Sequence, residues 1–234
     1  MSAKNTAGIV SLADYEAQAR QVLDDGTWTY LCGGAADERT LRANREAWAS
    51  SWLHSLAQGH MRIELLGRTL AHPILVAPVA WQRLAHTRLP LLLKGALHPD
   101  DARLARQHAV DGLIVSNHGG RTLDTALPTA WALPRLSDAV GDALPLLVDG
   151  GIRRGTDVLK AIALGARAVL VGRPIVQALA VAGAHGVAHA LRLLRDEVEI
   201  AMVLSGVAEL AEVHREMLFD APRSALGAPW ERPR

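Results

Sequence analysis

The sequence predicts an α/β fold in which parallel strands form a sheet or a barrel. From residue 89 onward, short apolar runs typical of buried strands alternate with segments of helical periodicity. Because parallel strands are joined by crossovers, usually helical, this alternation indicates right-handed βαβ units. With 234 residues, of which 50% are hydrophobic, the chain is long enough for one domain with its own core.

The N-terminal part is predicted to be helical, with a hairpin after the helices. Ser11-Leu12-Ala13-Asp14 resembles a capping box, and apolar residues follow it at helical spacing. A second helix is expected from Asp37 to Trp48, after the break at Gly33-Gly34. Residues 61–70 alternate around Gly67, as a small hairpin does.

The following strands are predicted from continuous apolar runs that end in turn residues. The run Ile74 to Ala77, which ends at Pro78, indicates a strand buried on both faces. The later elements, in order, are a strand at 89–94, a helix starting at Pro99, a strand at 113–116, a helix at 129–140, a strand at 144–149, a helix at 156–164, a strand at 168–171 and helices over 174–206.

These elements fit a single domain over residues 1–220. Its expected parts are the helices and hairpin (1–71), the first strand and a join (72–88) and the later strands with their helices (89–210), before a tail (221–234).

Composition excludes several classes of function. The net charge is +1 with no basic block, which argues against nucleic-acid binding. A single cysteine, Cys32, excludes an internal disulfide, fits a reducing compartment and is interpreted as an inert thiol. No uninterrupted apolar run reaches the roughly 20 residues of a membrane span. The polar start at 1–8 lacks a signal core, so a cytoplasmic location is expected.

Four strand ends carry polar and glycine residues of the kinds that bind ligands. They are Lys94-Gly95, Ser116 to Arg121, Asp149 to Arg153, and Gly172-Arg173. Glycines let backbone N–H groups approach a ligand closely, and arginine supplies a forked donor for phosphate. In eight-stranded βα barrels the last two strand ends often hold a phosphate group, so the two glycine-arginine ends predict such a site.

His118 is the candidate acid–base residue, because a strand precedes it and two glycines follow it. Histidine titrates near neutrality, and the nearby Arg121 can bind a carboxylate in a bidentate way. Lys94 closes an apolar strand, which is costly without an anionic partner, so it marks a ligand site or a plain salt bridge. Other histidines are expected to be solvated: His54, His98, His108, His185 and His189.

Several segments resemble the FMN-dependent 2-hydroxy-acid oxidases and dehydrogenases, such as glycolate oxidase, flavin-type lactate dehydrogenases and mandelate oxidases. The matching segments are SLADYEAQARQVL with Tyr30, GGAADERTLRANR, ILVAPVAWQRLAH, and the stretch from LPLLLKG to about residue 210. SNHGGRTLD and LVDGGIRRGTDVLKAIALGARAVLVGRP are the most specific of them.

The resemblance implies a TIM-type (β/α)8 barrel with FMN lying across the carboxyl ends of its strands. Lys94 would lie near the flavin N1/O2 edge and stabilise the anionic reduced ring. The other implied cofactor contacts are Pro78, Val79 and Ala80 along the ring, Ser116, and Asp149, Gly150, Gly151, Ile152, Arg153, Gly172 and Arg173 at the ribityl chain and phosphate.

The same resemblance implies a small 2-hydroxy acid as substrate and oxygen or another carrier as electron acceptor. His118 would be the base that takes a proton from the substrate. Arg121 would clamp the substrate carboxylate, and Tyr30 would hydrogen-bond it. No metal is implied.

The chain departs from this family in one place. Only residues 81–88 separate the first barrel strand from the segment that corresponds to strand five, so strands two to four are missing. The absent block would carry the acid that orients the catalytic histidine, an active-site tyrosine and a second substrate arginine. Five strands cannot close an eight-stranded barrel, and open edges expose unpaired backbone. We therefore expect the isolated chain to be marginally stable, to aggregate or to associate with another copy.

Three interpretations therefore stay open. The first is an FMN-dependent oxidase of 2-hydroxy acids. The second is an internally truncated, non-catalytic paralogue that binds FMN or a partner subunit weakly. The third is another phosphate-binding barrel, for instance an isomerase, against which the His118 to Arg121 cluster argues, since phosphate binding needs no base there.

Overall fold

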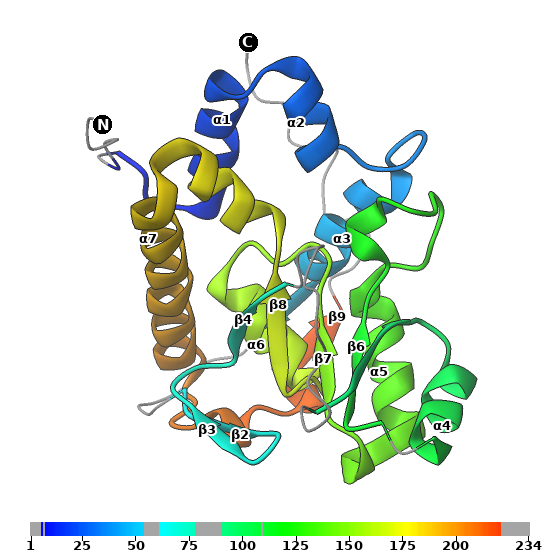
Figure 1. The fold of residues 1–234 in the computed structure, drawn as a ribbon. Coiled ribbons are helices and arrows are strands. Elements are labelled where there is room, and N and C mark those ends of the chain that lie inside the picture. Colours follow the sequence, from blue (N-terminus) through cyan, green and yellow to red (C-terminus); the bar gives the residue numbers. More distant parts are fainter. Residues whose placement is uncertain (1–5, 7, 54–60, 78–89, 109, 221–234) are drawn as a thin grey trace.

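A five-stranded parallel sheet forms the centre of the molecule (Figure 1). The computed structural model describes residues 6, 8–53, 61–77, 90–108 and 110–220. The strands are β4 (Ile74–Val76), β5 (Leu92–Ala96), β6 (Gly112–Val115), β7 (Leu146–Val148) and β8 (Ala168–Val171). Their order is β4-β8-β7-β6-β5, so the first strand of the sheet pairs with the last.

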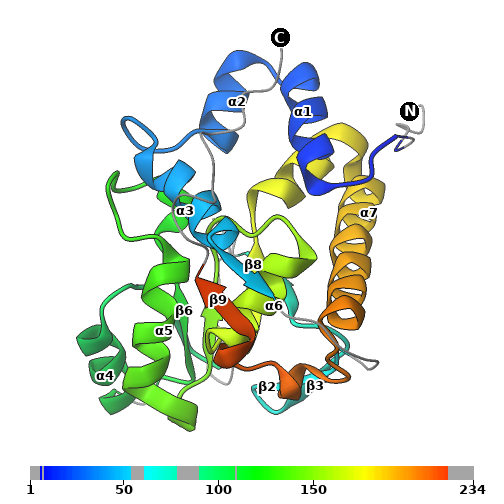
Figure 2. The same ribbon diagram turned by 180° about the vertical axis from the view of Figure 1, so that it is seen from behind.

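A helix follows each of the last four strands, as the predicted βαβ units require. These helices are α4 (Pro99–Gln107), α5 (Thr129–Val140), α6 (Gly155–Ala163) and α7 (Arg173–Ser205). Helices α5 and α6 cover one face of the sheet, which is the near face in Figure 2. At Gly155, α6 approaches α7 so closely that a Cβ would lie 2.2 Å from the carbonyl carbon of Glu197.

Helix α7 has 33 residues and is interrupted at Ala182 and Gly183 by non-helical backbone angles. Judged by length and composition alone, this helix could cross a membrane, although no uninterrupted apolar run in the sequence is as long as a membrane span. Its buried side chains, among them Ile175, Leu194 and Val198, belong to the main apolar core.

Three N-terminal helices pack around one end of the sheet (Figure 1). They are α1 (Leu12–Val22), α2 (Asp25–Cys32) and α3 (Arg39–Ala49). Helix α1 begins with the predicted capping box, in which Ser11 accepts from the Asp14 N–H. It packs against α7, where the buried Tyr15 hydroxyl lies 2.8 Å from Nδ1 of His189. The expectation that His189 is a solvated residue is therefore wrong.

Two antiparallel pairs complete the fold. The predicted hairpin is formed by β2 (Ile63–Leu65) and β3 (Arg68–Leu70). The second pair, β1 (Ser51–Leu53) with β9 (Leu218–Asp220), was not predicted. Four short 3-10 helices are η1 (His118–Gly120), η2 (Gly141–Ala143), η3 (Leu210–Glu212) and η4 (Arg215–Met217).

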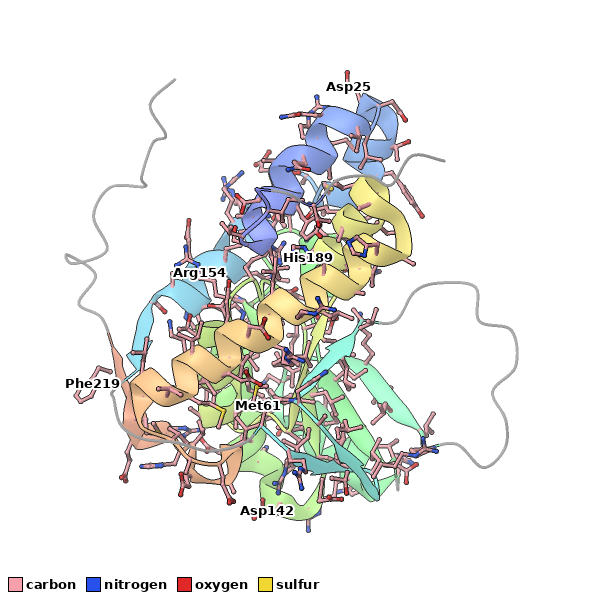
Figure 3. The ribbon with its side chains drawn as sticks, turned by 90° about the vertical axis from the view of Figure 1, so that its left-hand side faces the viewer. Asp25, Met61, Asp142, Arg154, His189 and Phe219 are labelled. Atoms are coloured by element: carbon pink, nitrogen blue, oxygen red, sulfur yellow. The ribbon has the colours of Figure 1, made fainter. Side chains whose placement is uncertain are left out.

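The two faces of the sheet bury different amounts of apolar surface. Alternate side chains, such as those of Leu113 and Val148, face the helices and belong to the large core. Figure 3 shows the side chains between the strands and the helices. The intervening residues Ile114, Leu147 and Leu170 form a small cluster with Leu65 of the hairpin. The inner face of the sheet is thus covered at one end by β2 and β3.

The sheet is open at both edges among the described residues. On β5 and just before it, Leu93 is 47% exposed and Leu91 is 63% exposed, and Val76 on β4 is 48% exposed. Five parallel strands with these edges form part of a barrel wall, in agreement with the prediction of an incomplete barrel.

The predicted strand at 89–94 has the wrong bounds. Pairing with β6 begins at Leu92 and continues through a register shift to Ala96, so Lys94 lies within β5 and not at its end. The Leu91 N–H instead donates to the Asp111 carboxylate, 2.7 Å away. Helix α2 was also not predicted, although Asp24 caps it by accepting from the Thr27 N–H.

Candidate active site

A cleft of about 440 Å³ lies at the carboxyl ends of the parallel strands. This is within the size range of pockets that bind small molecules. It is lined by eleven of the predicted site residues: Tyr30, Lys94, His118, Arg121, Asp149, Gly150, Gly151, Ile152, Arg153, Gly172 and Arg173. Ser116 is buried outside the lining, and Pro78, Val79 and Ala80 lie outside the described residues.

His118 is held on a tight turn directly after β6. Its φ of 56° lies in the left-handed region, and its N–H donates to the Ser116 hydroxyl at 3.0 Å. The next two residues, Gly119 and Gly120, also have positive φ. The Gly120 carbonyl accepts from the Ala35 N–H at 2.7 Å, so the N-terminal segment fixes this turn.

The surroundings of His118 favour its neutral form. Burial lowers the pKa of His118 from the usual 6.5, and the cations of Lys94 and Arg121 lower it further, against an opposing effect of Asp149. A neutral imidazole can accept a proton, so the electrostatics suit a general base at neutral pH.

Lys94 and Asp149 form an ion pair inside the cleft, with 3.0 Å between Nζ and Oδ2. The anionic partner that a lysine on an apolar strand requires is therefore Asp149. The pair is not closed off from ligands, because Lys94 is 28% exposed and the buried Oδ1 of Asp149 has no hydrogen-bond partner. A hydroxyl group on a ligand could donate to that oxygen.

The two predicted phosphate arginines carry buried positive charge. Burial lowers the pKa of Arg153 to about 10, and neighbouring Arg45 and Arg173 contribute to the shift. The pKa of Arg173 is lowered by burial and by the cations of Arg121 and Arg45. The buried Nε atoms of Arg153 and Arg173 have no hydrogen-bond partner. Such a donor set fits a phosphate dianion.

Glycines let the backbone approach a ligand at this end of the cleft. Gly150 and Gly151 have φ values of 90° and 95°, which other residues rarely adopt. A Cβ on Gly151 would also come within 2.5 Å of the Asn44 carbonyl oxygen. The turn can therefore exist only with glycine at this position.

Arg121 and Tyr30 lie together at the rim of the cleft. The guanidinium carbon of Arg121 is 5.4 Å from the centre of the Tyr30 ring, a cation–π arrangement. Arg121 and Arg173 both donate to the Gly33 carbonyl, at 3.3 and 3.0 Å. Tyr30 is 72% exposed, so its hydroxyl is accessible to a ligand that enters from solvent.

Helix α3 supports the site with residues that sequence reasoning missed. Asn44 and Asn117 exchange two amide hydrogen bonds of 2.9 and 2.7 Å, and Asn44 Oδ1 also accepts from the Thr129 N–H. Trp48 Nε1 donates to the Gly150 carbonyl at 2.9 Å. The available signal was a polar Asn44 on the same helix face as the apolar Ala47 and Trp48.

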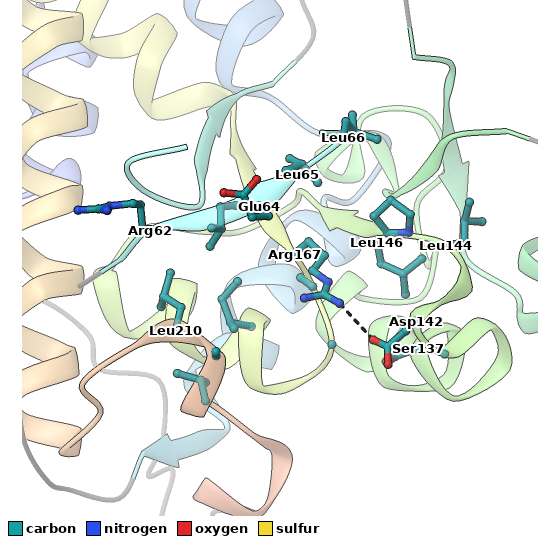
Figure 4. A pocket seen from close by; sticks show the side chains of 18 residues that line it. Arg62, Glu64, Leu65, Leu66, Ser137, Asp142, Leu144, Leu146, Arg167 and Leu210 are labelled. Carbon is teal, nitrogen blue, oxygen red and sulfur yellow. Dashed lines mark hydrogen bonds and ion pairs between the residues drawn. The ribbon is translucent and has the colours of Figure 1, made fainter. Parts of the chain in front are cut away.

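A larger cavity, of about 800 Å³, lies at the opposite end of the sheet (Figure 4). Hairpin residues such as Leu65 and residues around the starts of β7 and β8 line it. Its Arg167–Asp142 ion pair is exposed to solvent, with 3.2 Å between the atoms. The buried charges and the histidine lie in the smaller cleft. We therefore identify the smaller cleft as the candidate active site by its side chains, although the other cavity has the larger volume.

No group of three or more His, Cys, Asp or Glu side chains able to hold a metal ion occurs in the part of the chain that the structure describes. Cys32 is buried and accepts from the Gln177 amide at 3.3 Å.

Comparison with known families gives an independent view of the cleft. A family model described as FMN-dependent dehydrogenase matches residues 19–89 and 84–220. The two matched pieces meet at residues 84–89, within the region where the sequence skips from the first strand to the fifth.

The chain is also similar to individual proteins. A 2-hydroxyacid oxidase from Dictyostelium discoideum is 50% identical over 134 residues, which are 57% of this chain and 34% of the relative. Glycolate oxidase 1 from Zea mays is 54% identical over 133 residues, or 57% of this chain and 36% of the relative. The chain thus spans about a third of the length of these two relatives.

A longer alignment shows where the difference in length arises. The L-lactate oxidase of Alicycliphilus denitrificans is 31% identical over 353 residues, which cover 90% of this chain and 96% of the relative. Because this chain has only 234 residues, the relative contains a long internal stretch that this chain lacks.

The chain is also similar to solved structures of mandelate oxidase. Mandelate oxidase with (S)-2-phenylpropionate superposes with a TM-score of 0.83 and 31% identity, over 90% of this chain and 98% of that one. The structure of mandelate oxidase with benzoyl-formic acid gives the same values. From the family match over most of the sequence and the shared fold, the chain belongs to the FMN-dependent dehydrogenase family.

Proposed function

We propose that the chain binds FMN in the cleft and oxidises a small 2-hydroxy acid to the 2-oxo acid. The observation that carries this proposal is the gathering of His118, Lys94 and two phosphate-type arginines around one hollow. The third interpretation, another phosphate-binding barrel, is excluded because the chain belongs to the FMN-dependent dehydrogenase family.

The residues present fit the parts of FMN in turn. The unpaired donors of Arg153 and Arg173 suit the phosphate, and the unpaired Oδ1 of Asp149 suits a hydroxyl of the ribityl chain. Lys94 supplies positive charge beside the ring, where negative charge arises on reduction. When bound, FMN would supply the acceptor for the two electrons that leave the substrate.

The protein's own groups would bind the substrate and move its proton. Arg121 offers a fork to the substrate carboxylate and Tyr30 a hydroxyl, both at the rim. As the 2-hydroxy acid becomes the 2-oxo acid it gives up two electrons and two protons. A ring nitrogen of His118 would take one of these protons and later return it to solvent, and the other would leave with the two electrons to the acceptor that FMN supplies. Oxygen or another carrier would then remove the two electrons.

A second candidate function is binding of FMN without turnover. It is favoured by the state of His118, because no carboxylate is paired with its ring among the described residues. Asp149, which acts on the charge of His118, is already paired with Lys94. A histidine without an orienting acid is a poor base, because nothing fixes its tautomer.

Absorbance tests both functions. We expect the purified chain to be yellow with FMN and to bleach without oxygen when glycolate, lactate or mandelate is added. His118→Ala should abolish bleaching and keep FMN bound, whereas the exposed His185→Ala should change neither. A yellow protein that none of these acids bleaches supports the second function, and a colourless protein that binds no added FMN contradicts both.

A further inference from the structure

Helix α3, which packs on the turn at the phosphate end of the cleft, carries a third arginine, Arg45, outside the residues that line the cleft. The Gly150-Gly151 turn packs on this helix, where a Cβ on Gly151 would lie 2.5 Å from the Asn44 carbonyl oxygen and 3.0 Å from Trp48 Cδ1. Arg45 directly follows Asn44 in the helix. The backbone of Arg45 therefore adjoins the residue that contacts the turn before Arg153.

Only part of the Arg45 guanidinium has a partner. Its Nη2 is ion-paired to Glu16 of α1 at 2.7 Å, but its buried Nε has no hydrogen-bond partner. The Nε atoms of Arg153 and Arg173 are buried without partners in the same way. Three guanidinium donors therefore stay unsatisfied, and a buried donor without an acceptor is costly.

The charges of the three arginines act on one another. The cation of Arg45 helps to lower the pKa of both Arg153 and Arg173, after the larger effect of burial. Glu16 opposes the shift at both residues. The carboxylate of Glu16 thus offsets part of a positive charge that is in excess at this end of the cleft.

We propose that Arg45 is a third phosphate-binding residue of the flavin site, and that Glu16 competes with the phosphate for it. The inference rests on the proposed binding of FMN. The Glu16 carboxylate holds the guanidinium of Arg45, and a phosphate dianion offers the same group a second acceptor. The competition links α1, which packs on α7, to occupation of the cofactor site.

A comparison of FMN with riboflavin isolates the phosphate, because riboflavin has the same ring and ribityl chain without it. In the full chain, Arg45→Gln should raise the dissociation constant of FMN by about tenfold, the size expected for one charge-assisted hydrogen bond. The dissociation constant of riboflavin should stay unchanged. Quenching of flavin fluorescence measures both constants.

Arg195→Gln is the matched control, because Arg195 is ion-paired to Asp196 at 2.6 Å on α7. It removes the same charge away from the cleft and should leave both constants as they are. If Arg45→Gln weakens FMN and riboflavin equally, Arg45 has a structural role only and the inference is overturned. The same conclusion follows if neither constant changes.

Glu16→Gln tests the competition without removing the arginine. It should tighten FMN, but not riboflavin, by about two- to fivefold, the range of a partly exposed ion pair. An unchanged or weaker preference for FMN overturns the role of Glu16. If the wild-type chain does not prefer FMN to riboflavin, the proposed function fails as well. If it does, and Arg45→Gln keeps that preference, only the assignment of Arg45 fails.

Discussion

His118 shows how a single residue depends on segments far from it in the sequence. Its left-handed φ of 56° is stabilised by the Ser116 hydroxyl and by the bond between the Gly120 carbonyl and Ala35. A strained backbone of this kind persists when the surrounding structure holds it, and it often occurs at functional sites. The turn places the imidazole in the cleft beside Lys94 and Arg121.

The lowered pKa of His118 predicts a pH dependence for flavin reduction. Burial and the neighbouring cations disfavour the imidazolium, so His118 remains a base to a pH below its usual 6.5. The rate of anaerobic FMN reduction by a 2-hydroxy acid should be constant above pH 6.5 and fall only at lower pH. Stopped-flow absorbance measures this rate, and a fall centred above 6.5 would contradict the assignment.

Sequence reasoning predicted most residues that line the candidate cleft but not the partners of their side chains. A strand followed by glycines and a charged group was enough to identify His118, Asp149 and Arg173. The Asn44–Asn117 amide pair joins residues 73 positions apart, and no local pattern reveals such a contact. The sequence predicted that Lys94 needs an anionic partner, but it could not show that this partner is Asp149.

Among the elements, the short helix α3 supports the site through several of its side chains. Its buried face carries Thr40, Asn44, Ala47 and Trp48, and two of these side chains bond to strand-end turns. The Lys160 ammonium of α6 in turn donates to the Trp48 carbonyl at 2.8 Å. The helix therefore connects the His118 turn, the Gly150 turn and α6.

Removal of the Asn44 side chain should destabilise the whole fold. Asn44→Ala removes both bonds to the Asn117 amide, which keeps only its bond to the Leu127 carbonyl, and leaves the Thr129 N–H without its Asn44 acceptor in a buried place. We expect a loss of about 1–3 kcal/mol in the free energy of unfolding, the usual cost of buried unsatisfied polar groups. Urea denaturation measures it. Glu46→Ala, at an exposed position of the same helix, should cost far less, and equal losses would contradict this role.

Elements with strong local signals were predicted well. Helix α5 has the expected bounds, because Pro128 precedes it and Gly141 ends it. Helix α2 was missed, since it has eight residues and contains Gly26. Strands β1 and β9 have three residues each, too few to show a period, and they pair across most of the chain. Contacts at long range in the sequence decide these elements.

At the scale of the whole molecule, the described strands form part of a barrel wall whose two edge strands have no further strand partner among the described residues. The sheet has the order β4-β8-β7-β6-β5 and does not close on itself. The resemblance to the FMN-dependent family predicted the missing strands, and the short join at 81–88 agrees with it, because no crossover helix fits into so few residues. What covers the edges of the sheet could not be predicted, since such contacts depend on surfaces and not on sequence periodicity.

The free edges predict self-association. Exposed apolar edge strands pair with other chains, and β5 presents Leu93 at 47% exposure. The 25.1 kDa chain should therefore sediment as a larger species whose proportion rises with concentration. Leu93→Lys should reduce this association, whereas Leu104→Lys, at a similarly exposed position on α4, should not.

A cooperative melt at high temperature from a chain that sediments as a monomer would contradict this prediction. Equal effects of the two lysine substitutions would show that β5 is not the edge involved.

The pairing of β4 with β8 also has a consequence for synthesis on the ribosome. Among the described strands β4 is hydrogen-bonded to β8 alone, with Ile74 opposite Val169. At about 5–20 residues per second, β4 emerges on the order of 5–20 s before its neighbour has been translated. Throughout that delay its backbone is available to chaperones and to other nascent chains, so extra chaperone should raise the yield of folded protein.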